Sequence, residues 1–204
     1  MKISIGLIIL FIFIGGLMVS ETRSSLPSIK DNDNFATALV ANNPAPELGE
    51  AAGIYAWLIG SWDVRTVDYQ SDGKRRESTG EWHFSWVLEG RAVQDVWISP
   101  PRAQRNASLS KTGNRYGTTL RVYDSKIGAW RVTWLNSVSG AHDELVGKRK
   151  GSDIVQEGRD SDGNQMRWVF TDIKPDSFRW YGERSYDSGK TWQLEAEFFG
   201  KRRQ

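Results

Sequence analysis

Apolar and polar side chains alternate in short runs along most of the chain after residue 61. Large apolar residues occupy every second position of these runs, and charged or small polar residues stand between them. The apolar positions are Trp82, Phe84 and Trp86; Leu120 and Val122; Trp130, Val132 and Trp134; Met166, Trp168 and Phe170; Phe178 and Trp180; and Trp192, Leu194, Ala196 and Phe198. Because successive side chains of a strand point to opposite faces, this period of two predicts half-buried antiparallel strands.

Turn-forming pairs such as Asp72-Gly73 and Asp162-Gly163 separate the runs, as tight hairpins require. We predict ten strands, at residues 62–69, 75–88, 91–98, 115–124, 129–136, 141–150, 153–159, 165–172, 177–186 and 191–200. A sheet of ten strands has to split or curl, and closure into a barrel removes its exposed edges. The expected fold is therefore all-β, an antiparallel up-and-down β-barrel of about ten strands with the Trp-rich face inside.

A short helix is predicted before the first strand. Leu48, Ala52, Tyr55 and Leu58 follow helical spacing, and the segment begins after a proline and ends at Gly60. We expect this N-terminal helix to close one end of the barrel.

The first twenty residues have the pattern of an export signal. Lys2 precedes an apolar run of 17 residues, 3–19, which approaches the roughly 20 residues of a membrane span. Residues 1–20 are interpreted as a signal peptide or a membrane anchor, 21–46 as a flexible polar linker, and 47–204 as one barrel domain. The protein is expected to be exported, periplasmic or secreted, and to touch a membrane only through an uncleaved N-terminal segment.

The overall composition narrows the function classes. The chain has 27 basic and 25 acidic residues, so it lacks the excess of positive charge that nucleic-acid binding requires. It contains no cysteine, which excludes disulfides and thiolate nucleophiles. It contains ten tryptophans, which need a large core or a lined cavity.

The stretch "SYDSGKTW", 185–192, matches the Asp box of sialidase-type propellers. Propellers repeat such a motif in every blade, and this chain carries one complete copy. We interpret the stretch as a β-hairpin turn that is held by its own side-chain hydrogen bonds, and we call it the clasp. Asp187 is expected to accept hydrogen bonds from turn amides, Gly189 to adopt a left-handed conformation, and Trp192 to enter the core.

Few polar residues suggest chemistry. The chain has two histidines: His83 is expected on the outer face, and His142 at a strand end near Glu144. Two histidines do not supply the three or four ligands of a metal site, so no metal is expected. Asp95 shares a face with apolar neighbours in one strand register and faces solvent in the other, and the sequence leaves both open. The alternating arginines are expected outside, paired with Glu or stacked on aromatic rings; they are Arg121, Arg131, Arg167 and Arg179.

The inward aromatic residues are the candidate binding site. Ten-stranded barrels leave more internal room than eight-stranded ones, which favours a cavity over a filled core. The residues predicted to contact a ligand are Trp82, Trp86, Trp97, Tyr116, Trp130, Trp134, Trp168 and Trp180.

Several motifs carry a family resemblance that spans about Leu58 to Phe199. They are "LIGSWDV" from Leu58, "GEWHFSWVLEGRAVQDVW" from Gly80, "GTTLRVYD" from Gly117, "WRVTW" from Trp130, and the late Ser-x-Asp-x-Gly-Lys-Thr-Trp hairpin. With these motifs the chain resembles an uncharacterised bacterial family of lipocalin-like, or calycin-like, ten-stranded barrels. It is distantly similar to the nitrobindins, whose barrels hold haem through one axial histidine. The nitrobindin Gly-x-Trp-x-Gly-x-Gly signature and the late histidine are absent here, so no cofactor is expected.

The resulting hypothesis is an exported, lipocalin-like barrel that binds a small hydrophobic or planar molecule without catalysis. Two alternatives stay open. One is a barrel enzyme of the isomerase or hydratase type that uses Asp95 or His142 as an acid or base. The other is a structural module of the cell envelope with a filled core. The sequence does not define the oligomeric state.

Overall fold

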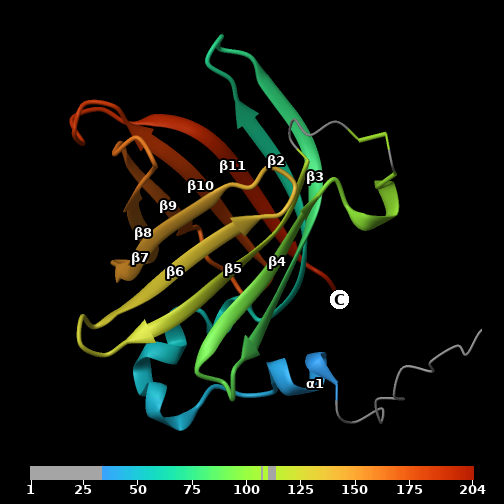
Figure 1. The fold of residues 1–204 in the computed structure, drawn as a ribbon, viewed down its shortest axis with the longest axis vertical. Helices are drawn as coiled ribbons and strands as arrows, with labels where there is room; N and C mark the ends of the chain where they lie inside the picture. The colour runs from blue at the N-terminus through green and yellow to red at the C-terminus, as the bar shows by residue number, and fades with distance from the viewer. Residues whose placement is uncertain (1–33, 107, 110–113) are drawn as a thin grey trace, which may run out of the picture. The chain divides into compact units, whose positions relative to one another are not determined.

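In the computed structural model of the protein, residues 34–106, 108–109 and 114–204 are described. In the unit that spans residues 35–204, eleven antiparallel strands form one sheet, and ten of them make up the barrel wall. They are β2 (Gly60–Tyr69), β3 (Arg75–Val87), β4 (Ala92–Ser99), β5 (Arg115–Asp124), β6 (Ala129–Asn136), β7 (His142–Lys150), β8 (Asp153–Arg159), β9 (Gln165–Thr171), β10 (Ser177–Ser185) and β11 (Gln193–Arg202). Each strand pairs with the next, and β11 pairs with β2, which closes the sheet into a barrel (Figure 1).

The predicted up-and-down barrel is confirmed, and every predicted strand end lies within two residues of the observed one. The alternation of the sequence maps onto the two faces of the wall. The core consists of large rings and branched side chains that point inward, and the fully buried ones include Trp62, Trp130, Phe170 and Ile154. This is a calycin- or lipocalin-like fold.

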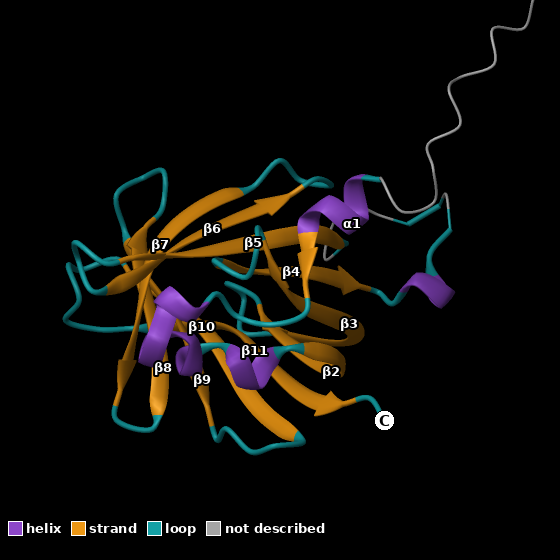
Figure 2. Ribbon diagram, turned by 90° about the horizontal axis from the view of Figure 1, so that it is seen from below, coloured by secondary structure: helices purple, strands orange, loops and turns teal. Residues whose placement is uncertain are grey.

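Two short 3-10 helices, η1 (Pro46–Ile54) and η2 (Ala56–Leu58), cover one end of the barrel (Figure 2). The predicted helix is present, but it is 3-10 in geometry and kinks at Gly49, where φ is 50°. The ring of Tyr55 packs edge-on against Trp130 at 5.2 Å, and the ring of Trp57 lies 5.5 Å from that of Phe178. Through these contacts η1 and η2 close one end of the barrel, as the sequence predicts, and we call these two helices the plug.

Residues 35–41 form secondary structure, although the sequence pattern predicts a flexible linker over 21–46. They form α1 (Phe35–Leu39) and β1 (Val40–Ala41), which pairs with β3 at Trp86 and Val87. That stretch of β3 extends past the first residue of β2, so β1 supplies its partner there. The predicted signal peptide or anchor and linker residues 21–33 lie outside the described residues. Among the residues that are described, no helix is long and apolar enough to cross a membrane.

The "SYDSGKTW" stretch forms the predicted clasp between β10 and β11. The Asp187 carboxylate accepts hydrogen bonds from the Thr191 backbone N–H at 2.8 Å and from the Thr191 hydroxyl at 2.7 Å. These bonds lower the pKa of Asp187 to about 2. The φ of Gly189 is 89°, which a side chain would strain.

The prediction that Trp192 enters the core is wrong. The register of β10 against β11 shifts by one residue after Gly182, so that Glu183 pairs with Leu194 and Glu195 is left over. A one-residue bulge reverses which face the following side chains take. Trp192 therefore lies outside, where the Arg167 guanidinium stacks 4.0 Å from the centre of its ring.

Candidate functional site

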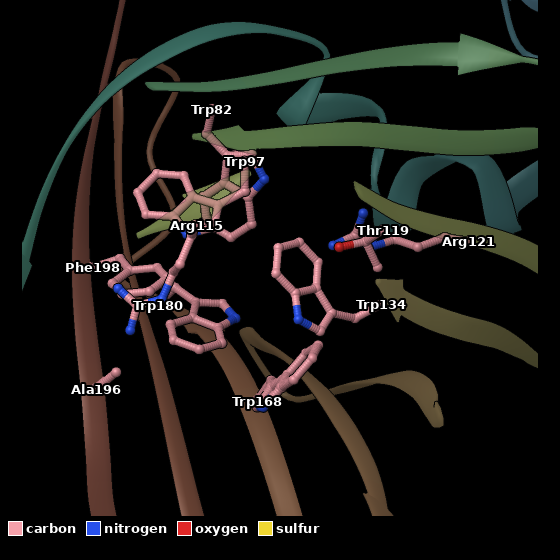
Figure 3. A pocket seen from close by; sticks show the side chains of 10 residues that line it. All are labelled: Trp82, Trp97, Arg115, Thr119, Arg121, Trp134, Trp168, Trp180, Ala196 and Phe198. Atoms are coloured by element: carbon pink, nitrogen blue, oxygen red, sulfur yellow. The ribbon is translucent and has the colours of Figure 1, made fainter. Parts of the chain in front are cut away.

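A cavity of about 130 Å³ lies inside the barrel. Aromatic rings from six strands converge on it, with Thr119 and Arg121 on one wall and Phe198 and Ala196 on the other (Figure 3). The lining residues are Trp82, Trp97, Arg115, Thr119, Arg121, Trp134, Trp168, Trp180, Ala196 and Phe198. The wall is thus mainly aromatic, with two cationic side chains in it.

The rings on one wall form a continuous stack. The Trp180 and Phe198 rings are parallel within 20°, with centroids 4.4 Å apart, and Trp97 stacks on the other side of Phe198 at 4.9 Å. Stacked rings of this kind hold one another in place, since each stacked pair contributes about 0.5–1.5 kcal/mol beyond its burial. A flat apolar molecule that entered the cavity would therefore meet an ordered aromatic surface.

Glycines on neighbouring strands make room for the rings to lie against the wall. A Cβ added at Gly117 would lie 2.5 Å from the six-membered ring of Trp134 and 2.3 Å from the Leu135 carbonyl oxygen. A Cβ at Gly80 would lie 2.4 Å from the Trp97 ring. Any other residue at these two positions would push a tryptophan toward the cavity.

A buried ion pair lies beside the cavity, and one of its members, Arg121, lines it. The Arg121 guanidinium donates to the Asp95 carboxylate at 2.6 Å, and both side chains are at most 1% exposed. Asp95 also accepts the Thr119 backbone N–H at 3.2 Å, while Arg121 lies 5.2 Å from the centre of the Tyr55 ring. Arg121 therefore stands between the cavity and the plug. Burial, opposed by the nearby guanidinium, raises the pKa of Tyr55 to about 12.

This arrangement settles one open prediction and corrects another. Asp95 takes the inward register, between Val93 and Trp97. The prediction that Arg121 faces outward is wrong: β5 turns Arg121 inward and leaves Val122 39% exposed. The reason is that a buried carboxylate needs a cationic partner, and Arg121 supplies it from the adjacent strand.

The other three alternating arginines lie outside, as predicted. Arg131 pairs with Asp124 at 2.8 Å, Arg179 pairs with Glu197 at 2.6 Å, and Arg167 pairs with Glu183. Together they show that the outer face carries a network of exposed or partly exposed ion pairs.

A second ion cluster lies where β5 begins. The Arg115 guanidinium donates to both oxygens of Asp68, at 2.5 and 3.3 Å, and Arg76 donates to the same carboxylate at 3.0 Å. Burial raises the pKa of Asp68, but the hydrogen bonds from the two arginines outweigh it and hold the pKa below its ordinary value. β5 and β2 are not neighbours in the sheet, so the contact between Arg115 and Asp68 crosses the barrel interior.

The structure brings five of the eight sequence-predicted site residues to the cavity. They are Trp82, Trp97, Trp134, Trp168 and Trp180. Trp86 and Trp130 are buried in the core but do not line the cavity. Tyr116 does not line this cavity: it is 39% exposed, and the Arg105 guanidinium lies 5.1 Å from the centre of its ring.

Neither histidine belongs to the cavity. His142 is exposed, and its Nε2 lies 3.7 Å from the Glu144 carboxylate. His83 lies on the outer wall, with Nδ1 2.9 Å from the Ser61 hydroxyl and Nε2 3.1 Å from Glu81. Hydrogen bonds from Arg102 hold the pKa of Glu81 well below its usual range. Among the described residues, no group of three His, Asp or Glu side chains could hold a metal ion.

Sequence reasoning missed five lining residues. Ala196 and Phe198 were on the predicted apolar face but were not selected. Arg115, Thr119 and Arg121 were missed because the apolar pattern of β5 indicated the opposite face. The available signal was Asp95 between two apolar neighbours, which calls for a cation on an adjoining strand.

Comparisons with known proteins support the fold. No protein-family model matches the chain, and no curated protein matches it in sequence. The chain is similar to the crystal structure of Rv2717c from M. tuberculosis, with 15% identity over 79% of this chain and 100% of that one, and a TM-score of 0.53. An S-type phycobiliprotein lyase, CPES from Guillardia theta, aligns at 12% identity over 76% of this chain and 93% of its own, with a TM-score of 0.49. At 15% identity, the likeness to Rv2717c shows a shared barrel fold alone.

Proposed function

We propose that the protein is an exported carrier or receptor that binds a small planar, mainly apolar molecule inside the barrel. The observation that carries the proposal is the cavity itself, about 130 Å³ in volume and walled by six aromatic rings. Protein interiors are otherwise close-packed, and voids of this size are few. An apolar cavity of similar volume takes up one benzene-sized ring.

The volume limits the size of the ligand. Pockets for drug-sized molecules measure about 300–1,000 Å³. The cavity here suits a single-ring compound of about six to ten heavy atoms. For such a compound we expect a Kd on the order of 10 µM to 1 mM, given the binding energy available per atom.

The proposal is tested by titrating the protein with phenol and benzyl alcohol in ligand-observed NMR. The variant Ala196→Phe places a ring in the cavity and is expected to abolish binding. The matched control is Val122→Phe, which adds the same ring at an exposed position of the outer face and is expected to bind like the wild type. Far-UV circular dichroism checks that both variants fold. Equal binding by all three proteins would place the ligand elsewhere.

The natural ligand is sought by native mass spectrometry of the protein purified from its own host. We expect a co-purified small molecule that is absent from Ala196→Phe. A bare chain, together with no binding of ring compounds, would leave the filled-core structural role as the better account.

Export is part of the same proposal and is supported by the apolar run 3–19 behind Lys2. Fractionation of the host and the intact mass of the chain test it. A periplasmic or secreted chain lacking about the first 20 residues agrees with a signal peptide. A membrane-bound chain of full length agrees with an anchor, and a cytosolic chain of full length contradicts export.

A further inference from the structure

The cavity wall is rich in hydrogen-bond donors and poor in acceptors. Two guanidinium groups line it, those of Arg115 and Arg121, and no carboxylate does. Guanidinium groups donate hydrogen bonds and accept none, so the polar part of this wall is complementary to a molecule that brings acceptors with it.

The two arginines differ in how far their charge is neutralised. Arg121 and Asp95 form a one-to-one pair, which is neutral as a unit. Arg115 shares the single carboxylate of Asp68 with Arg76, so that cluster carries one excess positive charge. An incoming anion is therefore stabilised at Arg115, whereas contact with Arg121 alone would leave an uncompensated negative charge in the interior.

The position of Arg115 places this excess charge beside the stacked rings. Its guanidinium lies 5.6 Å from the centre of the Phe198 ring, and its side chain is 23% exposed. The planar guanidinium fork matches the geometry of a carboxylate. A ring that stacks in the cavity can thus present an acid group to Arg115. The acidic side chains Asp143 and Asp160 are not among the lining residues.

We propose that the ligand is a planar aromatic molecule bearing a carboxylate, with its ring inside the cavity and its acid group on Arg115. The inference rests on the proposed binding function and adds the chemical class of the ligand. Arg121 and the Thr119 hydroxyl lie on the opposite wall, where they can donate to a further acceptor atom of the ligand (Figure 3).

The test compares benzoate with benzamide, which has nearly the same shape and no charge. Ligand-observed NMR or calorimetry at pH 7 measures both Kd values. We expect the wild type to prefer benzoate by roughly ten- to a hundredfold, the range for a hydrogen bond to a charged group. Arg115→Gln is expected to weaken benzoate binding and to bring the two Kd values within about threefold.

Two control variants remove the same charge elsewhere. Arg131→Gln removes an exposed arginine of the outer face and should keep the preference for benzoate. Arg76→Gln removes the other partner of Asp68 without touching the cavity lining, and it should lower the preference less than Arg115→Gln does. Loss of preference in Arg131→Gln would mean that long-range charge, and not contact with Arg115, selects the anion.

A variant with the opposite sign guards against a folding defect in Arg115→Gln. Asp68→Asn removes the competing carboxylate and is expected to tighten benzoate binding severalfold and to raise the preference for benzoate over benzamide. Unchanged or weaker benzoate binding in a folded Asp68→Asn protein overturns the assignment. Equal binding of benzoate and benzamide by the wild type refutes the acid preference and leaves the proposed function standing. Binding of neither compound refutes the proposed function itself.

Discussion

Replacing Arg121 by methionine should destabilise the barrel more than any comparable charge removal on its surface. Arg121→Met leaves the Asp95 carboxylate inside the barrel with the Thr119 N–H as its remaining described hydrogen-bond partner. Removing one member of a buried ion pair costs about 3–5 kcal/mol, because the other charge is stranded in a medium of low polarity. For a chain of this size, such a loss lowers Tm by roughly 6–20 °C.

The assay is urea unfolding followed by tryptophan fluorescence, with thermal melts by circular dichroism. Arg131→Met is the control: its ion pair with Asp124 has a similar length, 2.8 Å, but the Arg131 side chain is 63% exposed. An exposed pair contributes less than about 1 kcal/mol. The double variant Asp95→Asn with Arg121→Met removes both charges and is expected to recover most of the loss. If Arg121→Met and Arg131→Met have the same unfolding free energy, the buried ion pair does not exist as described.

Three further predictions concern packing and titration. Gly117→Ala should cost about 1–3 kcal/mol in urea unfolding, because its Cβ meets the Leu135 carbonyl and Trp134, whereas Gly53→Ala, which meets nothing within 4 Å, should be nearly neutral. The free energy of unfolding should fall as the pH drops below about 4, because Asp68 and Glu81 have folded-state pKa values below their unfolded values and stop stabilising the fold as they protonate. Asp68→Asn should lose less unfolding free energy than the wild type between pH 4 and pH 2. An equal slope in the two proteins would show that Asp68 does not contribute to the acid sensitivity. NMR titration should give Asp187 a pKa of about 2, and Thr191→Val should raise it by removing a donor to the charged form; an unchanged value would mean that the clasp is not formed.

The sequence predicted the barrel because its signals are local. Alternation of large and polar residues identifies each strand, and Asp-Gly and Ser-Gly turns separate them. Closure followed from the number of strands, because a sheet of ten strands has to split or curl and closure removes its exposed edges. The plug followed from Tyr55 and Leu58 at helical spacing, although its 3-10 geometry and its kink at Gly49 did not.

The errors arose where a distant residue decides the outcome. In β5, Leu120 and Val122 indicated the wrong inner face, because the partner that draws Arg121 inward is Asp95 on β4. In β11, alternation placed Trp192 inside, and only the bulge at Glu195 reverses it. Such a bulge is defined by the pairing of β10 with β11, which a single strand does not reveal.

The sequence predicts the aromatic lining of the candidate site but not the charged residues beside it. Four tryptophans of the cavity, Trp82, Trp134, Trp168 and Trp180, follow from their inward register alone, whereas the register of Trp97 was left open with that of Asp95. The cluster of Arg115, Asp68 and Arg76 joins β5 to β2 and β3 across the barrel interior, so no spacing within one segment indicates it. The acid preference proposed for the cavity therefore needed the three-dimensional structure.

The most direct test of the central claim is a crystal structure of the protein soaked with 4-bromophenol, with bromine located by its anomalous signal. The account predicts one bromine inside the barrel, within contact distance of Trp134, Trp180 or Phe198, and no such peak in Ala196→Phe. Bromine found only on the outer wall, or in the interior of Ala196→Phe as well, would contradict it.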